Sequence, residues 1–173
     1  MSTGKHVRGR GARGLRAPGT AATNRVMTTR DDDFPLGPLH SLDELARTLR
    51  DHPGLCIRYS KGPAADADEG SVDRESGAEL PGLSVNPLEP ERWWSRPVED
   101  WLARQLCQYR QVQENDPDRF AWVLTGREVG RGPDSEPLLA DTVAIARVAP
   151  RAVDEASNRY RERFDAGRGP EHD

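Results

Sequence analysis

The stretch FAWVLTGREVGRGPDSEPLL, residues 120–139, decides the fold because an apolar run leads directly into a polar, glycine-rich segment. Its first part, Phe120–Leu124, is apolar on both faces, which is typical of a central strand of a sheet. Its second part, Gly126–Leu139, holds three glycines, two arginines, three acidic residues and two prolines, and it is predicted to be a loop. Scaffolds commonly present binding and catalytic side chains on loops, so we expect the working surface to lie here.

Helices and strands are predicted on both sides of this stretch. Ser41 and Glu44 have the spacing of a capping box, and apolar residues at helical spacing follow them. Further helices are expected at 96–110 and 150–164, and further strands at 55–60, 82–86 and 143–148. The connection 61–81 is predicted to lack regular structure, as either a functional flap or a disordered insertion. Because strands and helices do not alternate regularly, we expect an α+β fold, with one domain over residues 34–165 and a small mixed, largely antiparallel sheet flanked by helices.

Residues 1–33 are predicted to be a disordered basic arm, and residues 166–173 a disordered tail. Residues 1–30 carry seven basic and no acidic side chains, whereas the rest of the chain has 18 basic and 29 acidic ones, a net charge of −11. The arm is interpreted either as a segment that touches nucleic acid or another acidic surface, or as an extension without a role, with Met27 as a natural start. The acidic body makes nucleic acid an unlikely main partner.

Composition also bears on location and on metal chemistry. The sequence has no run of eighteen apolar residues and no apolar segment after its basic N-terminus, so we expect no membrane span, no signal peptide and a cytoplasmic location. Cys56 and Cys107 lie in apolar patterns and are expected to be reduced core residues. The four histidines fall in predicted tails and turns, which gives a His-based metal site or catalytic dyad little support.

Polar residues on two predicted strands are the first candidates for a site. Arg58 and Ser60 alternate with apolar residues on one strand, and Ser84 and Asn86 do the same on another. If the two strands pair with the same side buried, these four side chains line a common polar groove. The alternative is a solvated outer face.

The adjacent Trp93 and Trp94 precede a predicted helix and cannot both face one core. We expect one ring to pack under the helix and the other to lie at the edge of a groove. Aromatic residues at helical spacing are more often core than ligand platform, and Trp94 is the candidate for stacking on a ligand ring.

The predicted loop supplies the remaining candidates. Arg127 and Arg131 can each clamp a phosphate or carboxylate, while Asp134 and Glu136 can act as acid, base or charge stabiliser. In the alternative interpretation, Arg131 pairs with Asp134 or Glu136 and only holds a turn together. The order of the glycines matches neither a phosphate-binding P-loop nor a dinucleotide-binding fingerprint.

Four segments carry a resemblance to a known family: YSKGP at 59–63, LPGLSVNPL at 80–88, the pair Trp93–Trp94 with Arg96–Pro97, and WVLTGREVGRGPDSEPLL at 122–139. Together they resemble a family of actinobacterial proteins known only as a domain of unknown function. The resemblance covers roughly Leu39 to Ala149. It implies no activity.

A second resemblance rests on the order of three residues. Arg58 on an early strand, Ser84 on a short second strand and Glu136 before an apolar pair are similar to the Arg–Ser–Glu order of ADP-ribosyltransferases. That resemblance implies NAD as cofactor, with Arg58 on its phosphates, Ser84 near the nicotinamide ribose and Glu136 as the catalytic carboxylate. The sequence departs from that family, because no Ser-Thr-Ser run occurs at Ser84 and Asp134 stands two residues before Glu136.

The favoured hypothesis is a non-catalytic module that recognises an anionic small molecule or a protein partner. Arg58, Arg127 and Arg131 would supply the positive charge. This hypothesis needs no activated nucleophile, and the sequence shows none.

Overall fold

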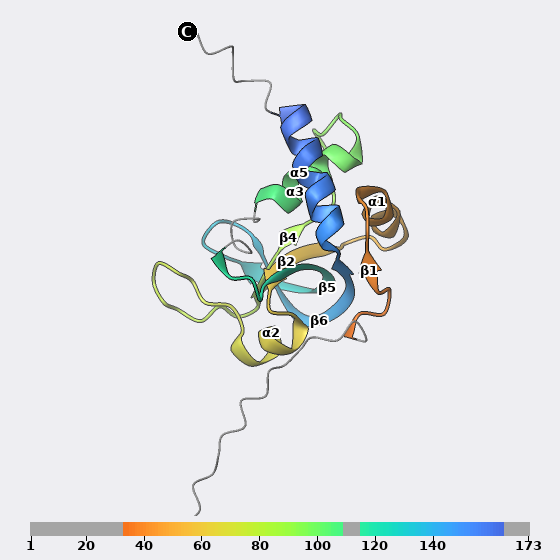
Figure 1. Ribbon diagram of the computed structural model, residues 1–173. Helices are drawn as coiled ribbons and strands as arrows, with labels where there is room; N and C mark the ends of the chain where they lie inside the picture. Colours follow the sequence, from red (N-terminus) through yellow and green to blue (C-terminus); the bar gives the residue numbers. More distant parts are fainter. Residues whose placement is uncertain (1–32, 109–114, 165–173) are drawn as a thin grey trace, which may run out of the picture.

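The computed structural model describes residues 33–108 and 115–164. It shows a six-stranded mixed sheet with helices, so the predicted α+β class is confirmed (Figure 1). The strands are β1 (Pro38–Leu39), β2 (Cys56–Ser60), β3 (Leu83–Ser84), β4 (Asn86–Pro87), β5 (Phe120–Arg131) and β6 (Pro137–Val148). The helices of the described residues are α1 (Leu42–Asp51), α2 (Pro63–Glu69), α3 (Val98–Gln108) and α5 (Pro150–Phe164).

The long hairpin β5–β6 replaces the predicted loop, and this prediction was wrong. Both strands run through the glycine-rich segment, and only a short turn at 132–136 separates them, closed by the Gly132 amide on the Glu136 carbonyl at 2.8 Å. The register shifts at Val123/Leu124, Thr125/Arg127 and Glu128/Gly130, and the last two shifts fall at Gly126 and next to Gly130. Bulges let a paired strand bend and accommodate an extra residue, which is why glycine and charge did not end the strand here.

The sheet closes on itself through one extended segment, residues 83–87. Its first half, β3, pairs with β6, and its second half, β4, pairs with β2, while the Val85 amide donates to the Pro137 carbonyl at 3.1 Å. Figure 1 shows the hairpin curling round to allow this. Inside the curl lies a small apolar cluster made of Phe34, Cys56, Leu83, Val85, Phe120, Trp122, Leu124 and Leu139.

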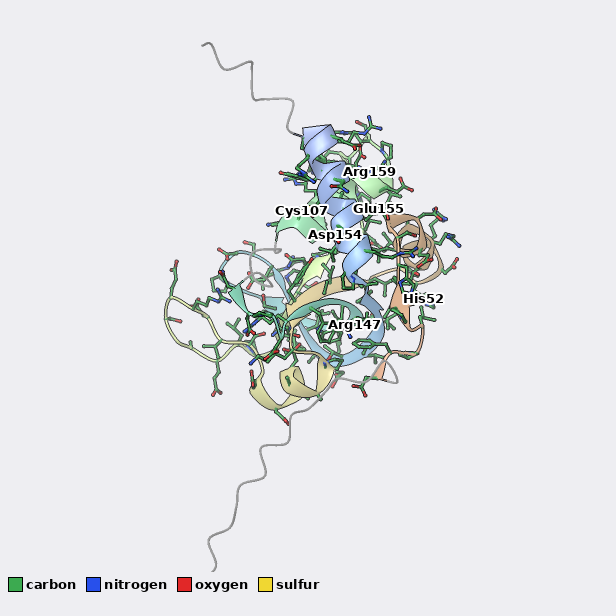
Figure 2. All side chains as sticks on the ribbon, in the orientation of Figure 1. His52, Cys107, Arg147, Asp154, Glu155 and Arg159 are labelled. Atoms are coloured by element: carbon green, nitrogen blue, oxygen red, sulfur yellow. The ribbon has the colours of Figure 1, made fainter. Side chains whose placement is uncertain are left out.

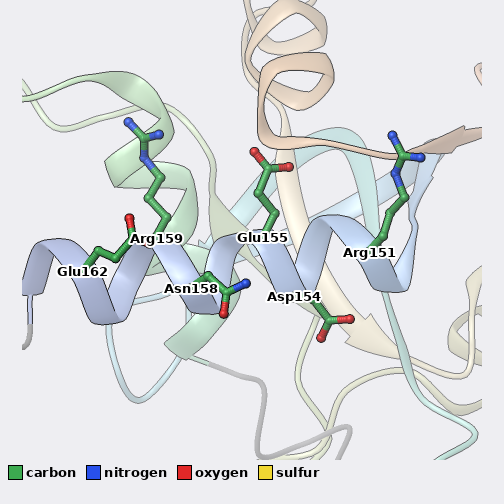
Figure 3. Close-up of a pocket in the computed structure, with 6 residues that line it drawn as sticks. All are labelled: Arg151, Asp154, Glu155, Asn158, Arg159 and Glu162. Carbon is green, nitrogen blue, oxygen red and sulfur yellow. The ribbon is translucent and has the colours of Figure 1, made fainter.

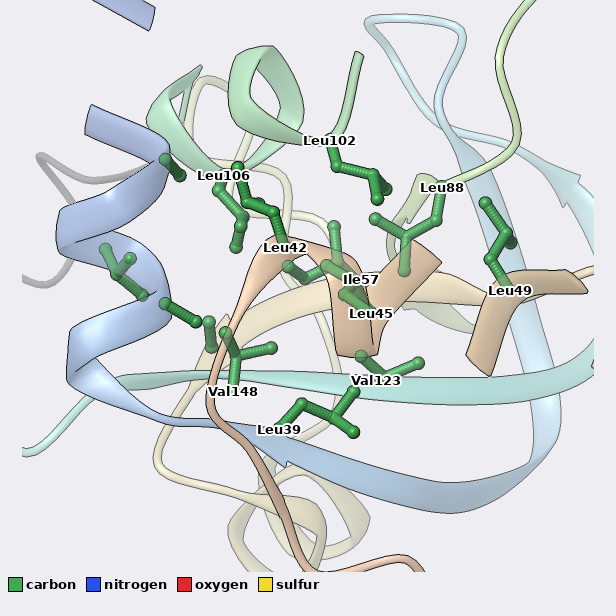
Figure 4. Close-up of a cluster of buried hydrophobic side chains, with 14 of the residues drawn as sticks. Leu39, Leu42, Leu45, Leu49, Ile57, Leu88, Leu102, Leu106, Val123 and Val148 are labelled. Atoms are coloured by element: carbon green, nitrogen blue, oxygen red, sulfur yellow. The ribbon is translucent and has the colours of Figure 1, made fainter. Parts of the chain in front are cut away.

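The other face of the sheet carries the main core, under α1, α3 and α5. Ile57 and Val123 lie side by side in the register and are fully buried against leucines of the helices (Figure 4). The predicted cap of α1 is confirmed, because Ser41 Oγ accepts from the Glu44 amide at 3.2 Å. The Glu44 carboxylate reaches back to the His40 amide, one residue before the expected Ser41.

The segment 61–81, expected to lack structure, contains α2 and an isolated bridge between Val72 and Glu79. The predicted disordered arm and tail fall almost wholly at 1–32 and 165–173, outside the described residues. Among the helices described, none has the length and apolar character needed to cross a membrane.

Candidate functional site

Arg58 and Ser60 on strand β2 lie neither in the predicted open groove nor on the solvated outer face that was its alternative. Both faces of β2 are covered, and the Arg58 side chain is only 14% exposed. Its guanidinium is bidentate on a carboxylate of α2, with Nε 2.8 Å from Asp66 Oδ2 and Nη2 2.9 Å from Oδ1. Sequence alternation identified the correct face but not the carboxylate that covers it.

Ser60 completes this buried polar group. Its hydroxyl donates to Asp66 Oδ2 at 2.5 Å and accepts from the Trp122 indole N–H at 2.8 Å and from the Gly62 amide at 3.2 Å. A serine hydroxyl has one donor and two acceptor positions, so its hydrogen-bonding capacity is filled. Arg58 and Ser60 therefore hold the Asp66 carboxylate directly, and Trp122 holds the Ser60 hydroxyl in place.

Ser84 links this group to the hairpin turn. Its carbonyl accepts from Arg58 Nη1 at 2.6 Å, and its hydroxyl donates to Glu136 Oε1 at 3.1 Å. The other carboxylate oxygen of Glu136 accepts from the Asp134 amide at 2.9 Å. Three of the residues predicted for the site (Arg58, Ser84 and Glu136) are thus brought into one hydrogen-bonded chain.

The two hairpin arginines do not converge. Arg127 pairs with Asp141 at 2.9 Å, whereas Arg131 pairs with Glu128 at 2.8 Å and donates to the Ser135 carbonyl at 3.2 Å. The interpretation that Arg131 pairs with Asp134 or Glu136 is wrong. Both arginine side chains are well exposed, at 65% and 58%. Exposed ion pairs of this kind contribute only about 0–1 kcal/mol, so a ligand can displace either carboxylate at little cost.

Arg131 lies at the rim of a small hollow at one end of the curled sheet, which we call the hairpin hollow. Its volume is about 220 Å³. Its walls come from the chain before β2, from β4 and from the hairpin: Gly54, Leu55, Cys56, Pro87, Glu89, Gly126, Glu128, Arg131, Pro137 and Leu139. The mouths of curled sheets are common ligand sites.

The electrostatics of the hairpin hollow are mixed. Burial and, to a smaller extent, the carboxylates of Glu128 and Glu89 together raise the pKa of the Cys56 thiol to about 11. The thiol is therefore protonated at neutral pH and is no nucleophile. The interior favours a neutral or positive group, while Arg131 at the rim favours a negative one.

One tryptophan ring of the pair packs against the core and the other is exposed, as expected, but the exposed ring is Trp93 and not Trp94. Trp93 is 66% exposed, whereas Trp94 packs edge-on against Trp101 and lies over Phe164, with ring centroids 5.1 and 6.3 Å away. Trp94, the predicted stacking residue, is thus the ring that packs against the core.

A second, larger hollow of about 420 Å³ runs along α5 (Figure 3). Three of its lining residues fasten α5 to its neighbours. Arg151 donates to the His40 carbonyl at 2.7 Å, Glu155 accepts from the Leu42 amide at 3.1 Å, and Arg159 donates to Asp100 at 2.7 Å. Figure 2 shows Asp154, Glu155 and Arg159 following one another along this helix. Three of the six side chains that line this hollow therefore serve to attach α5.

Comparison with known proteins supplies a family but no activity. Residues 32–171 match a family of unknown function, DUF6098, over most of the chain. The chain belongs to this family. No curated protein and no solved structure matches it. Among the described residues of this DUF6098 protein, no group of three or more His, Cys, Asp or Glu side chains is placed to hold a metal ion.

Asp66 is the residue that sequence reasoning missed. It lies in the polar segment that was expected to lack structure, eight positions after Arg58. A short acidic helix of mostly exposed residues gives no periodic signal. Only the burial of both faces of β2, which the structure shows and the sequence did not predict, makes a counter-ion for Arg58 necessary.

Proposed function

We propose that this protein is a non-catalytic recognition module that binds the anionic group of a small molecule or protein partner at the hairpin hollow. Arg131 is the anchor. The observation that carries the proposal is the Arg131 side chain, 58% exposed, at the rim of a hollow partly lined by Leu55 and Leu139 and held by the exposed Glu128 carboxylate and the Ser135 carbonyl. A guanidinium in this position binds carboxylate or phosphate through two parallel hydrogen bonds.

The carboxylates of the hollow narrow the ligand class. Glu89 already accepts from the Gly54 amide at 2.8 Å, and Glu128 is released when a ligand takes Arg131. A small polyanion that fills the hollow would meet both charges. The favoured ligand therefore places its anionic end on Arg131 at the rim and a neutral or positively charged group inside.

The test is a titration of the full chain with the dipeptide Ala-Leu and with inorganic phosphate, followed by amide chemical shifts. Arg131→Ala should weaken binding of the dipeptide at least tenfold. Arg127→Ala is the matched control, because it removes an equally exposed guanidinium that lies outside the hollow. Equal losses in the two variants, or shifts that avoid the residues of the hollow, would refute the proposal.

An ADP-ribosyltransferase-like enzyme binding NAD is the second candidate. The hydrogen-bonded chain Arg58–Ser84–Glu136 supports it, because it connects an arginine, a serine and a carboxylate. Among the described ion pairs, Glu136 has no arginine partner. Asp66 opposes it, since its carboxylate occupies the guanidinium that would hold the phosphates. Heat stabilisation by millimolar NAD that disappears in Ser84→Ala would favour this candidate, and an unchanged melting temperature would eliminate it.

A further inference from the structure

Helix α2 is attached to the rest of the molecule in an unusual way. Of its seven residues only Asp66 is buried, and none belongs to either apolar cluster of the described residues. Most surface helices are held by an apolar stripe. In α2, the side chain that attaches the helix to the sheet is the Asp66 carboxylate, which is bound by Arg58 and Ser60.

The helix is also weak in itself. Seven residues are too few to form a stable helix without tertiary contacts. Asp68 and Glu69 lie in its last turn, where the helix dipole disfavours negative charge, and no basic residue is there to offset them. Loss of the Asp66 contacts should therefore release or unfold α2 while the sheet stays intact.

Both ends of α2 can act as hinges. Gly62 and Gly70 have φ values of 105° and 66°, which side-chain-bearing residues rarely adopt. Outside them the chain is fixed again: Ser60 is hydrogen-bonded within the buried group, and Ser71 Oγ accepts from the Ser84 amide at 3.0 Å. Residues 62–70 form a defined flap between two anchored positions.

The groups beneath the flap form a carboxylate-binding site. Arg58 presents two parallel N–H donors, and Ser60 presents a hydroxyl that the Trp122 indole holds in place. These donors sit on paired strands β2 and β5 and so stay in position when α2 leaves. None of these residues lines the hairpin hollow.

We infer that Arg58 and Ser60 form a carboxylate-binding site occupied in the closed protein by the chain's own Asp66, and that α2 is a lid which opens when the carboxylate of a ligand takes that place. This site is separate from the hairpin hollow, so it does not depend on the proposed function. The tethered Asp66 competes with any free carboxylate, at an effective concentration of about millimolar or more for so short a tether. The apparent affinity for a free carboxylate is therefore the intrinsic affinity of the open site multiplied by the fraction of molecules that are open.

The experiment compares Asp66→Ala with Asp68→Ala in the full chain, using acetate as the probe and chloride to match ionic strength. Both variants remove one carboxylate from α2, but Asp68 is exposed. Asp66→Ala should be stabilised by acetate in a saturable manner, with an apparent Kd at least about tenfold lower than that of wild type. Asp68→Ala should behave as wild type. Acetate effects that are equal in the two variants would overturn the inference.

Amide hydrogen exchange of the wild-type protein tests whether α2 opens, even if Asp66→Ala does not fold. The Asp66 and Gly70 amides, bonded to the Gly62 and Asp66 carbonyls, report on α2. They should exchange faster than the amides of β2 and faster still when acetate is added, because acetate favours the open state. A buried ion pair with only a structural role would not respond to acetate. Exchange of α2 at the rate of global unfolding would refute the lid.

Discussion

Gly132→Ala tests whether the glycine at the hairpin turn is required by the Glu136 carboxylate that lies over it. A Cβ at this position would lie 2.0 Å from Glu136 Oε1 and 2.3 Å from its Cδ. The carboxylate therefore lies directly over Gly132, where it accepts from Ser84 Oγ and from the Asp134 amide. Because the obstacle is the end of a flexible side chain, alanine can be admitted only by moving Glu136 off these partners.

The size of the effect follows from two opposing terms. Two hydrogen bonds to a half-exposed carboxylate are lost, which we put at about 1–2 kcal/mol in total. Replacing a glycine that does not have a positive φ by alanine returns about 0.5–1 kcal/mol. The net loss for Gly132→Ala is then about 0.5–1 kcal/mol, or roughly 2–5 °C in melting temperature for a domain of this size.

A double-mutant cycle with Glu136→Ala isolates the cause, and chemical denaturation measures it. In the Glu136→Ala background the obstacle is gone, so Gly132→Ala should stabilise by about 0.5 kcal/mol. Gly130→Ala is the matched control, since nothing lies within 4 Å of a Cβ there, and it should stabilise in either background. If Gly132→Ala shifts stability by the same amount with and without the Glu136 carboxylate, the reasoning is wrong.

Three further predictions concern Trp122, Gly126 and Cys56 in the sheet. In urea unfolding, Trp122→Phe should lower the free energy of unfolding by about 1–3 kcal/mol more than Trp101→Phe does. Both changes remove a similar volume, but only the Trp122 indole donates to Ser60, whereas the Trp101 indole N–H has no hydrogen-bond partner in the described structure. Equal losses in the two variants would contradict this. Gly126→Ala should lower the free energy of unfolding by about 1–3 kcal/mol, because the new Cβ would lie 2.9 Å from the Ala140 carbonyl oxygen and the backbone of β6 would have to move. An unchanged free energy of unfolding would show that the hairpin accommodates the methyl group without strain. The pKa of Cys56 is raised from 9.0 to about 11, so the neutral thiol favours the folded state, and its contribution is complete below pH 9 and lost as the pH rises towards 11. Urea unfolding from pH 8 to 11 should show this fall in wild type and a smaller one in Cys56→Ala, and rapid alkylation of the folded protein at pH 8 would contradict it.

Local features of this fold were predictable from sequence because the groups that create them are close in the chain. The Ser41 cap and the start of α5 at Pro150 depend on residues within one helical turn. The two-sided apolar pattern of Phe120–Leu124 likewise predicted a central strand, and the structure shows that segment buried between two clusters. Each of these signals is independent of what the distant chain does.

The site could not be predicted to the same degree, because its contacts are made across the chain. Glycine and charge between Gly126 and Arg131 indicated a loop, yet bulges absorb them within a paired strand. Alternation put Arg58 on the correct face of β2, but its partner Asp66 comes from a segment without periodicity. Pairing between β3 and β6, which brings Ser84 to Glu136, joins residues more than fifty positions apart.

Ser84 connects the two proposed sites physically. Its carbonyl is bound by Arg58, its amide by Ser71, the anchored residue that follows the flap, and its hydroxyl binds Glu136 in the hairpin turn. The carbonyl of Ser135 in that turn accepts from Arg131 at the rim of the hairpin hollow. Opening of α2 removes the Asp66 carboxylate from Arg58, whose Nη1 also binds the Ser84 carbonyl, and so acts on the backbone that leads to the turn. Since such coupling is reciprocal in free energy, a ligand at Arg131 that moves the turn must shift the closure of α2 by the same amount.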